Sequence, residues 1–262
     1  MRLATWNVNS LKARLERVLA WVERHEPDVL CLQETKLSDA QAPLMDFRAL
    51  GYDLVHHGPG RWNGVAIASR IGIDDVTAGI PTPDGWTDDG GRFLAASCGS
   101  LRVASIYVPN GRVVGSETYL EKLEWLARLS RWLDDNDPAT ELAICGDFNV
   151  APEDADVWDP LAAHGGTHVS PRERAAVAKL REWGMVDVIR TFNPDPGFFT
   201  WWDYRAGHFH KNFGMRIDHV YVTPPLGARA TAAVRDREAR KPSTYPGIPS
   251  DHAPLIVDFA DS

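Results

Sequence analysis

Cysteine and long apolar stretches are both scarce in this sequence. Its 262 residues include three cysteines, Cys31, Cys98 and Cys145, which are too far apart for a Cys-x-x-Cys metal site. We expect buried, reduced thiols and a cytoplasmic location. No apolar run approaches the roughly 18 residues of a membrane-spanning helix, and the opening stretch RLATWNV lacks the longer apolar core of a signal peptide. These absences exclude a disulfide-rich secreted domain and a membrane protein.

An excess of positive charge is also absent, because the formal net charge is -8. A uniformly acidic surface repels a phosphate backbone, which argues against a protein that coats nucleic acid generally. The charges are nevertheless segregated: residues 134 to 159 contain acids and no Lys or Arg, whereas residues 170 to 181 and 201 to 216 are mainly basic. This segregation permits a basic binding face, although solvated surface charge explains most of these residues singly.

No low-complexity linker or break in composition divides the chain. A hydrophobic content of 44% is enough for one large core, so we expect a single domain over residues 1–262, acting as a monomer. Helical periodicity predicts a helix after Ser10 and a second after Ser116. A third helix is predicted from Ser170, which begins a capping box with Glu173, to a stop near Gly184.

Short strand candidates occupy much of the remaining sequence. Because several follow one another without an intervening helix, we expect mixed rather than purely parallel sheets. Two packed sheets flanked by helices, an α/β (α+β) architecture, accommodate these elements. The predicted strands cover roughly residues 2–8, 28–33, 53–56, 64–69, 92–98, 101–108, 141–147, 216–222 and 254–259.

A recurrent pattern places polar side chains at the ends of these apolar runs. In GDFNVAP, Asp147 and Asn149 are two residues apart, so on a strand they would face the same side. A turn former or helix cap is the simpler explanation for any one such residue, but not for so many together. The set comprises Asn7, Glu34, Tyr107, Asn110, Asp147, Asn149, Asp218, His219, Asp251 and His252.

If these strand ends converge, they form a pocket suited to hydrolysis at phosphorus. Carboxylate and amide oxygens without cysteine favour Mg²⁺, for which Mn²⁺ substitutes, over Zn²⁺. Glu34 with Asn7 can hold the metal, and Asp147 can take a proton from the attacking water. A protonated His252 supported by Asp218 can donate to the phosphate.

The motifs, taken in order, resemble the exonuclease III family of abasic-site endonucleases within the DNase I-like endonuclease, exonuclease and phosphatase superfamily. The resemblance covers almost the entire chain, through WNVNSLKAR, PDVLCLQETK, YVPNG, GDFNVAPED, VSPRERA, FTWWDYRAG, RIDHVYVT and SDHAPL. A lone SDH or QET would be weak, but the shared order and spacing are specific. The resemblance implies a four-layer α/β sandwich and a divalent-metal phosphodiesterase.

The resemblance also implies a role for each matching residue. One departure concerns Asn9, which stands where some relatives carry an aspartate near the metal, and a neutral amide weakens the case for a fixed second ion. The implied roles are metal binding by Asn7 and Glu34, phosphate contact by Tyr107 and Asn110, water activation by Asp147 and Asn149, an Asp218–His252 pair, and Asp251 near a second metal.

The basic and aromatic segments resemble the DNA-repair branch of the superfamily, where a helix and an aromatic loop enter the DNA. Trp201, Met215 and Ile217 would line a pocket for a flipped abasic sugar, although some relatives carry a Trp at the position of Met215. One of Trp201 and Trp202 is expected to be an ordinary core residue. The expected DNA contacts are Asn110, Arg112, Arg172, Trp201, Arg205, Lys211, Met215, Arg216 and Ile217.

The implied function is a DNA-repair nuclease that cleaves double-stranded DNA 5′ to abasic sites and also trims 3′ ends as a 3′-to-5′ exonuclease. A second hypothesis is another metal-dependent phosphodiesterase or phosphatase of the superfamily, which activity on phosphorylated inositols or lipids would favour. A third is a catalytically silent nucleic-acid-binding module, which metal-dependent turnover would exclude.

Overall fold

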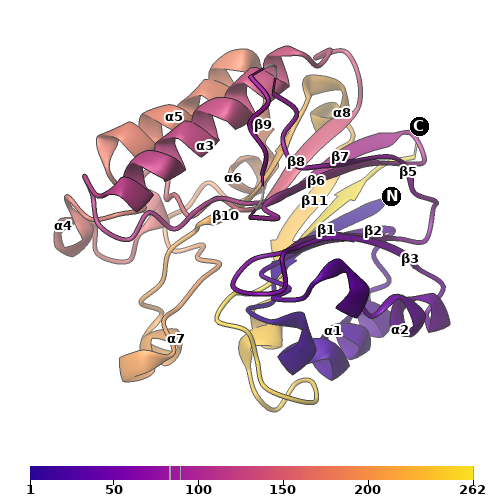
Figure 1. Ribbon diagram of the computed structural model, residues 1–262. Helices are drawn as coiled ribbons and strands as arrows, with labels where there is room; N and C mark the ends of the chain where they lie inside the picture. The colour runs from indigo at the N-terminus through magenta and orange to yellow at the C-terminus, as the bar shows by residue number, and fades with distance from the viewer. Residues whose placement is uncertain (83, 89, 262) are drawn as a thin grey trace.

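Two six-stranded β-sheets pack face to face in a computed structural model that describes residues 1–82, 84–88 and 90–261. Figure 1 shows helices on the outer face of each sheet, which gives four layers in the order helix, sheet, sheet, helix. This confirms the predicted sandwich of two mixed sheets flanked by helices. Within the described ranges, no helix is both long enough and apolar enough to cross a membrane.

The first sheet is built mainly from the N-terminal part of the chain and is completed by two strands from the C-terminal part. Its central pair, β1 and β2, is parallel, and every other neighbouring pair is antiparallel. In spatial order the strands are β11 (Ala230–Arg235), β12 (Leu255–Phe259), β1 (Arg2–Asn7), β2 (Val29–Gln33), β4 (Val65–Ser69) and β3 (Asp53–His57).

The second sheet repeats this arrangement. Its central pair, β7 and β8, is parallel, and the remaining pairs are antiparallel. Strands β5, β9 and β11 were not among the predicted ones; β9 is only two residues long, β5 is largely exposed, and β11 is mostly half-buried or exposed. In order the strands are β5 (Asp74–Ala78), β6 (Phe93–Cys98), β7 (Leu101–Tyr107), β8 (Leu142–Asp147), β10 (Asp218–Val222) and β9 (Val186–Asp187).

The three predicted helices are present and begin at the expected caps. Ser10 and Ser116 accept hydrogen bonds from the first turns of α1 and α3, and Ser170 forms a capping box with Glu173 at the start of α5. Gly184 ends α5 with a φ of 120°. The helices are α1 (Leu11–His25), α2 (Leu44–Ala49), α3 (Glu117–Asp134), α4 (Pro160–Ala163), α5 (Pro171–Trp183), α6 (Val188–Phe192), α7 (His208–Lys211) and α8 (Pro224–Ala228).

The apolar core has three main parts, which follow from the alternation of side chains along the strands. One lies between the sheets, a second lies under α3 and α5, and a third lies under α1 and α2. Central strands such as β2 and β8 are buried on both faces, which explains their nearly continuous apolar sequence. Cys31, Cys98 and Cys145 are buried free thiols, as predicted.

Candidate active site

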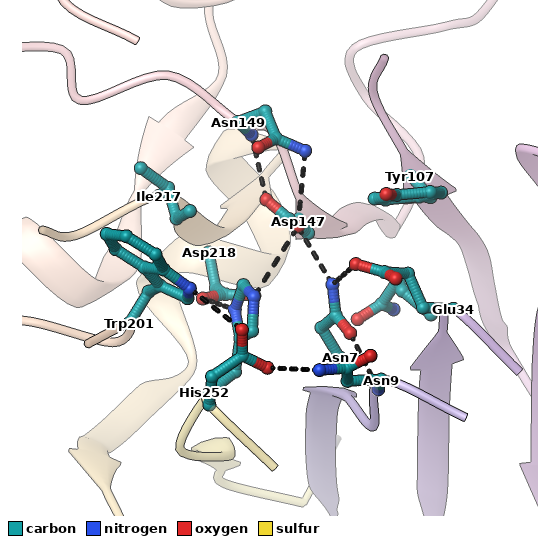
Figure 2. Close-up of polar contacts among 12 residues, drawn as sticks. Asn7, Asn9, Glu34, Tyr107, Asp147, Asn149, Trp201, Ile217, Asp218 and His252 are labelled. Atoms are coloured by element: carbon teal, nitrogen blue, oxygen red, sulfur yellow. Dashed lines mark hydrogen bonds and ion pairs between the residues drawn. The ribbon is translucent and has the colours of Figure 1, made fainter. Parts of the chain in front are cut away.

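Polar residues from both sheets meet at one end of the sandwich. Because β1 and β2 are parallel, and β7 and β8 are parallel, the carboxyl ends of each pair lie at the same edge of their sheet. The sheets pack with these two edges adjacent, as Figure 2 shows. We call the resulting group the strand-end cluster; it comprises Asn7, Glu34, Tyr107, Asp147, Asn149, Asp218 and His252.

Asn7 joins the two sheets within this cluster. Its Nδ2 donates to Glu34 Oε1 and to Asp147 Oδ2, both at 2.9 Å. Its Oδ1 accepts the backbone N–H of Asn9 at 2.9 Å. The predicted convergence of the strand ends is therefore present, although the amide nitrogen of Asn7, and not its oxygen, faces the carboxylates.

Asp147 and Asn149 adjoin each other, but not through strand alternation. Strand β8 ends at Asp147, and Asn149 adopts a left-handed backbone with φ 51°. Its backbone N–H donates to Asp147 Oδ1 at 2.8 Å, and its Nδ2 lies 3.3 Å from Asp147 Oδ2. Gly146 permits the close strand packing just before, because a Cβ there would lie 2.0 Å from the Ile106 carbonyl oxygen.

His252 and Asp218 form the predicted pair. The Nδ1 of His252 lies 2.8 Å from Asp218 Oδ2, and its Nε2 lies 3.8 Å from Asp147 Oδ2. Burial alone would lower the pKa of His252, but the neighbouring carboxylates, Asp218 foremost, raise that pKa to about 10. The side chain is therefore an imidazolium near neutral pH.

Burial also dominates the electrostatics of Asp147, which is 1% exposed. Loss of solvent raises the pKa of Asp147 to about 7; the imidazolium of His252 opposes this rise, and the carboxylates of Asp218 and Glu34 add to it. For Tyr107, burial and the carboxylates of Glu34 and Asp147 hold the phenol pKa well above its usual value. A carboxylate poised near neutrality beside an imidazolium is suited to proton transfer.

The cluster has a donor set that can bind a metal ion. Ligand atoms of Glu34, Asp147 and His252 lie within 4.8 Å of one another. Because His252 is protonated and bound to Asp218, it is a poor ligand, which leaves carboxylate oxygens of the kind that hard cations prefer. Carboxylates outnumber the imidazolium here, so the residues present fit a bound cation.

Asp251 lies beside this donor set rather than within it. Its Oδ1 accepts from Asn9 Nδ2 at 3.0 Å, and its Oδ2 accepts from Trp201 Nε1 at 3.1 Å. Asn9 is bound on its other side by Lys36 Nζ at 2.6 Å, and the same ammonium lies 3.0 Å from Glu34 Oε2. Sequence reasoning missed Lys36, although it directly follows the QET motif.

An apolar group adjoins the cluster on the side of His252. Trp201 forms an isolated β-bridge with His252 and another with Met215. Trp201, Met215 and Ile217 belong to one hydrophobic cluster, in which Trp201 is half-buried, whereas Trp202 is fully buried elsewhere in the core. The expectation that one of the two tryptophans is a core residue is confirmed.

Arg216 does not lie on the surface, which corrects its expected role as a DNA contact. It is 1% exposed and donates to Asp156 Oδ1 at 2.6 Å, to Asp187 Oδ2 at 2.8 Å and toward His219 Nδ1 at 3.0 Å. All of its charge is thus compensated inside the protein. We call Arg216, Asp156, Asp187 and His219 the arginine cluster.

The polar residues among the other expected DNA contacts are exposed; they are Asn110, Arg112, Arg172, Arg205 and Lys211. Asn110 donates through Nδ2 to Asn149 Oδ1 at 3.1 Å. A cleft of about 260 Å³ is lined by Glu34, Tyr107, Asn110 and Arg112, among others. Arg172 lies at the start of α5 and Lys211 in α7, and both are exposed, as is Arg205, which pairs with Asp203.

Sequence reasoning also missed a buried lysine close to the cluster. Lys122 lies in the apolar stripe of α3 and is 0% exposed. Its Nζ bonds the backbone oxygens of Asn110 and Asn149 as well as Glu173. A charged residue at an inward position of an amphipathic helix was the available signal.

Two packed mixed sheets, with carboxylates, amides and an imidazolium at their joined strand ends, define a metal-dependent phosphohydrolase. The chain belongs to the Endonuclease/Exonuclease/phosphatase family, whose model matches residues 4–252. This confirms the resemblance that the motifs indicated.

Individual relatives match over the whole chain. Exodeoxyribonuclease III of Haemophilus influenzae is 32% identical over 99% of this chain and 100% of its own length. Among solved structures, an AP endonuclease from Archaeoglobus fulgidus and the 3′-5′ exonuclease NExo from Neisseria meningitidis are each 37% identical to this chain. Each superposes with a TM-score of 0.94, and each match covers 100% of both chains.

Proposed function

We propose that this chain is a DNA-repair nuclease that hydrolyses phosphodiesters 5′ to abasic sites in duplex DNA and removes nucleotides and blocking groups from 3′ ends. The observation that carries the proposal is the pairing of a buried Asp147, with a pKa of about 7, and a cationic His252 at the joined strand ends. Similarity to an exodeoxyribonuclease III, an AP endonuclease and a 3′ phosphatase supports DNA as the substrate.

Asp147 acts as the general base in this proposal. Its carboxylate takes a proton from water, and Asn149, bonded to it through the backbone N–H, orients that water without competing as a base. The negative charge that develops on the phosphate then lies between His252, held as a cation by Asp218, and the cleft side chains Tyr107 and Asn110.

Glu34 and Asn7 are the residues that we assign to a metal ion, Mg²⁺ with Mn²⁺ as a substitute. A divalent cation bound there supplies Lewis-acid stabilisation of phosphate charge. Hard carboxylate oxygens such as those of Glu34 suit these ions. Asn7 Oδ1, which accepts the Asn9 N–H here, would have to turn toward Glu34 to join them. The Asn9 amide, held between Lys36 and Asp251, favours one resident ion over two.

Duplex DNA is held by exposed cations, with Arg112 at the cleft and Arg172, Arg205 and Lys211 elsewhere on the surface as phosphate contacts. The apolar group of Trp201, Met215 and Ile217 lies beside His252 and accepts a sugar that lacks its base. A solved neighbour, the 3′ phosphatase NExo from Neisseria, is described as bound to a product DNA hairpin. We propose that this chain acts on DNA as a monomer.

One assay tests the proposal against its alternatives. A labelled duplex with a single abasic site, a matched intact blunt duplex and a 3′-phosphate duplex are incubated with Mg²⁺ or with chelator. We expect Mg²⁺-dependent incision at the abasic site and shortening or dephosphorylation at 3′ ends. Turnover of inositol phosphates or phosphoinositides without turnover of DNA would instead identify another hydrolase of the family, and binding without turnover would identify a silent module.

A further inference from the structure

The buried Lys122 lies behind the site rather than in it. An ammonium group has three N–H donors, and each has one acceptor here: Asn149 O at 2.6 Å, Asn110 O at 3.2 Å and Glu173 Oε1. Both Lys122 and Glu173 are completely shielded from solvent. The lysine therefore connects helix α3 with two loops of the active site and with the first turn of α5.

Glu173 extends this connection to a third loop. Its Oε1 also accepts from Thr167 Oγ1 at 3.1 Å and from His168 N at 3.0 Å, and its Oε2 accepts from Ser170 N at 3.1 Å. Although burial alone would raise the pKa of Glu173, the ammonium of Lys122 and these donors lower it. The carboxylate is therefore ionised. Burial lowers the pKa of Lys122 from its usual value, but Glu173 opposes this shift, and the three acceptors around Nζ match the three donors of an ammonium group.

The two carbonyls bound by Lys122 belong to residues whose side chains face the strand-end cluster. Asn149 has a left-handed backbone, with φ 51°, a conformation that most non-glycine residues keep only where surrounding contacts fix it. Gly111, next to Asn110, packs so closely on the lysine stem that a Cβ would lie 2.9 Å from Lys122 Cδ. The side chains of Asn110 and Asn149 are bonded to each other at 3.1 Å.

We propose that Lys122, paired with Glu173, is a positioning residue that fixes the backbones of Asn110 and Asn149, so that their amides face the phosphate and the attacking water. This inference rests on the proposed function, because it assigns Asn149 to the water. A displacement of about 1 Å in such groups can lower a rate about 100-fold. The competing explanation is that the pair only joins α3 to α5.

A single and a double substitution separate the two explanations. Lys122→Met keeps the aliphatic stem and removes the ammonium, which leaves Glu173 buried without its partner and lowers the melting temperature. Adding Glu173→Gln removes the unpaired charge. We expect the double variant to recover most of the melting temperature, while kcat on DNA stays about 10- to 100-fold below wild type in both variants.

KM for DNA and the Mg²⁺ concentration for half-maximal rate should change little, because phosphate contacts and metal ligands are untouched. Lys241→Met, which removes a surface pair with Glu238, is the matched control and should behave as wild type. Recovery of kcat in parallel with the melting temperature, or a normal kcat in folded Lys122→Met, would contradict the proposal. An inactive wild-type protein would instead refute the proposed function.

Discussion

The strand-end cluster and the arginine cluster are both buried and both contain two aspartates and a histidine, but their charges are balanced differently. In the arginine cluster, Arg216 pairs with both Asp156 and Asp187. Burial alone would raise the pKa of Asp187, yet the guanidinium of Arg216 holds it below its usual value. In the strand-end cluster, the pKa of Asp147 is raised to about 7 because burial and neighbouring carboxylates outweigh His252.

The histidines of the two clusters, His219 and His252, also differ in charge. Burial and the adjacent Arg216 lower the pKa of His219 to about 4, so it is neutral, whereas His252 is an imidazolium between carboxylates. The charge of the arginine cluster is balanced within the protein, whereas the strand-end cluster can still bind a cation and accept a proton. Chemistry is therefore expected where the protein leaves carboxylate charge unbalanced.

We expect Asp147→Asn to have the largest effect, which is on the rate of cleavage. Loss of a positioned base lowers single-turnover cleavage by about 10²- to 10⁴-fold. A carboxyl whose folded-state pKa is raised stabilises the fold below its unfolded pKa and loses that contribution as pH rises through 7. At pH 8 the substitution should therefore not lower the free energy of unfolding, and DNA binding should persist. Near-normal turnover would remove Asp147 from the mechanism.

Arg216→Met removes the cation that balances the buried carboxylates of the arginine cluster. It leaves Asp187 buried without an arginine partner and Asp156 with Arg190 alone, so the free energy of unfolding should fall by about 3–5 kcal/mol in urea titrations. Arg181→Met, which breaks a surface pair with Glu153, is the control and should cost no more than about 1 kcal/mol. A shallower salt dependence of DNA binding in the folded Arg216 variant would restore Arg216 as a phosphate contact.

Glu34→Gln should have a smaller effect, which is confined to the dependence of the cleavage rate on Mg²⁺ concentration. A neutral amide is a poorer ligand for a hard dication, so the Mg²⁺ concentration for half-maximal cleavage should rise by about 10- to 100-fold. Glu121→Gln, an acid that lines the same cleft, should leave the titration unchanged. Identical metal titrations for wild type and Glu34→Gln would mean that Glu34 has a structural role.

The comparison also explains what the sequence could and could not predict. Asp147, Glu34 and Asn7 follow apolar runs directly, so local pattern alone marks them as strand ends; that these ends converge depends on how the two sheets pack. Arg216 looks like a surface cation beside aromatic residues, because its partners Asp156 and Asp187 are 60 and 29 residues away. Pairing over such separations is set by tertiary packing, which a local pattern does not contain.

The helices likewise have features that local sequence predicts and features that depend on tertiary packing. Ser116 and Ser170 were predicted because a cap acts on the next few residues. The role of Lys122 depends on two loops and on Glu173, 51 residues away. Strand alternation, which predicted that Asp147 and Asn149 face the same side, did not apply to Asn149, because that residue reaches Asp147 through a left-handed turn after the strand ends.

The most direct test is to titrate the aspartate carboxyls of the metal-free protein by ¹³C NMR, with Asp147→Asn and Asp187→Asn to assign the two signals. The account predicts that Asp147 titrates near pH 7 and that Asp187 titrates below its usual value, in the same molecule and the same experiment. An Asp147 signal that titrates in the ordinary acidic range, together with Asp187, would contradict the claim that the strand-end cluster is the one left uncompensated.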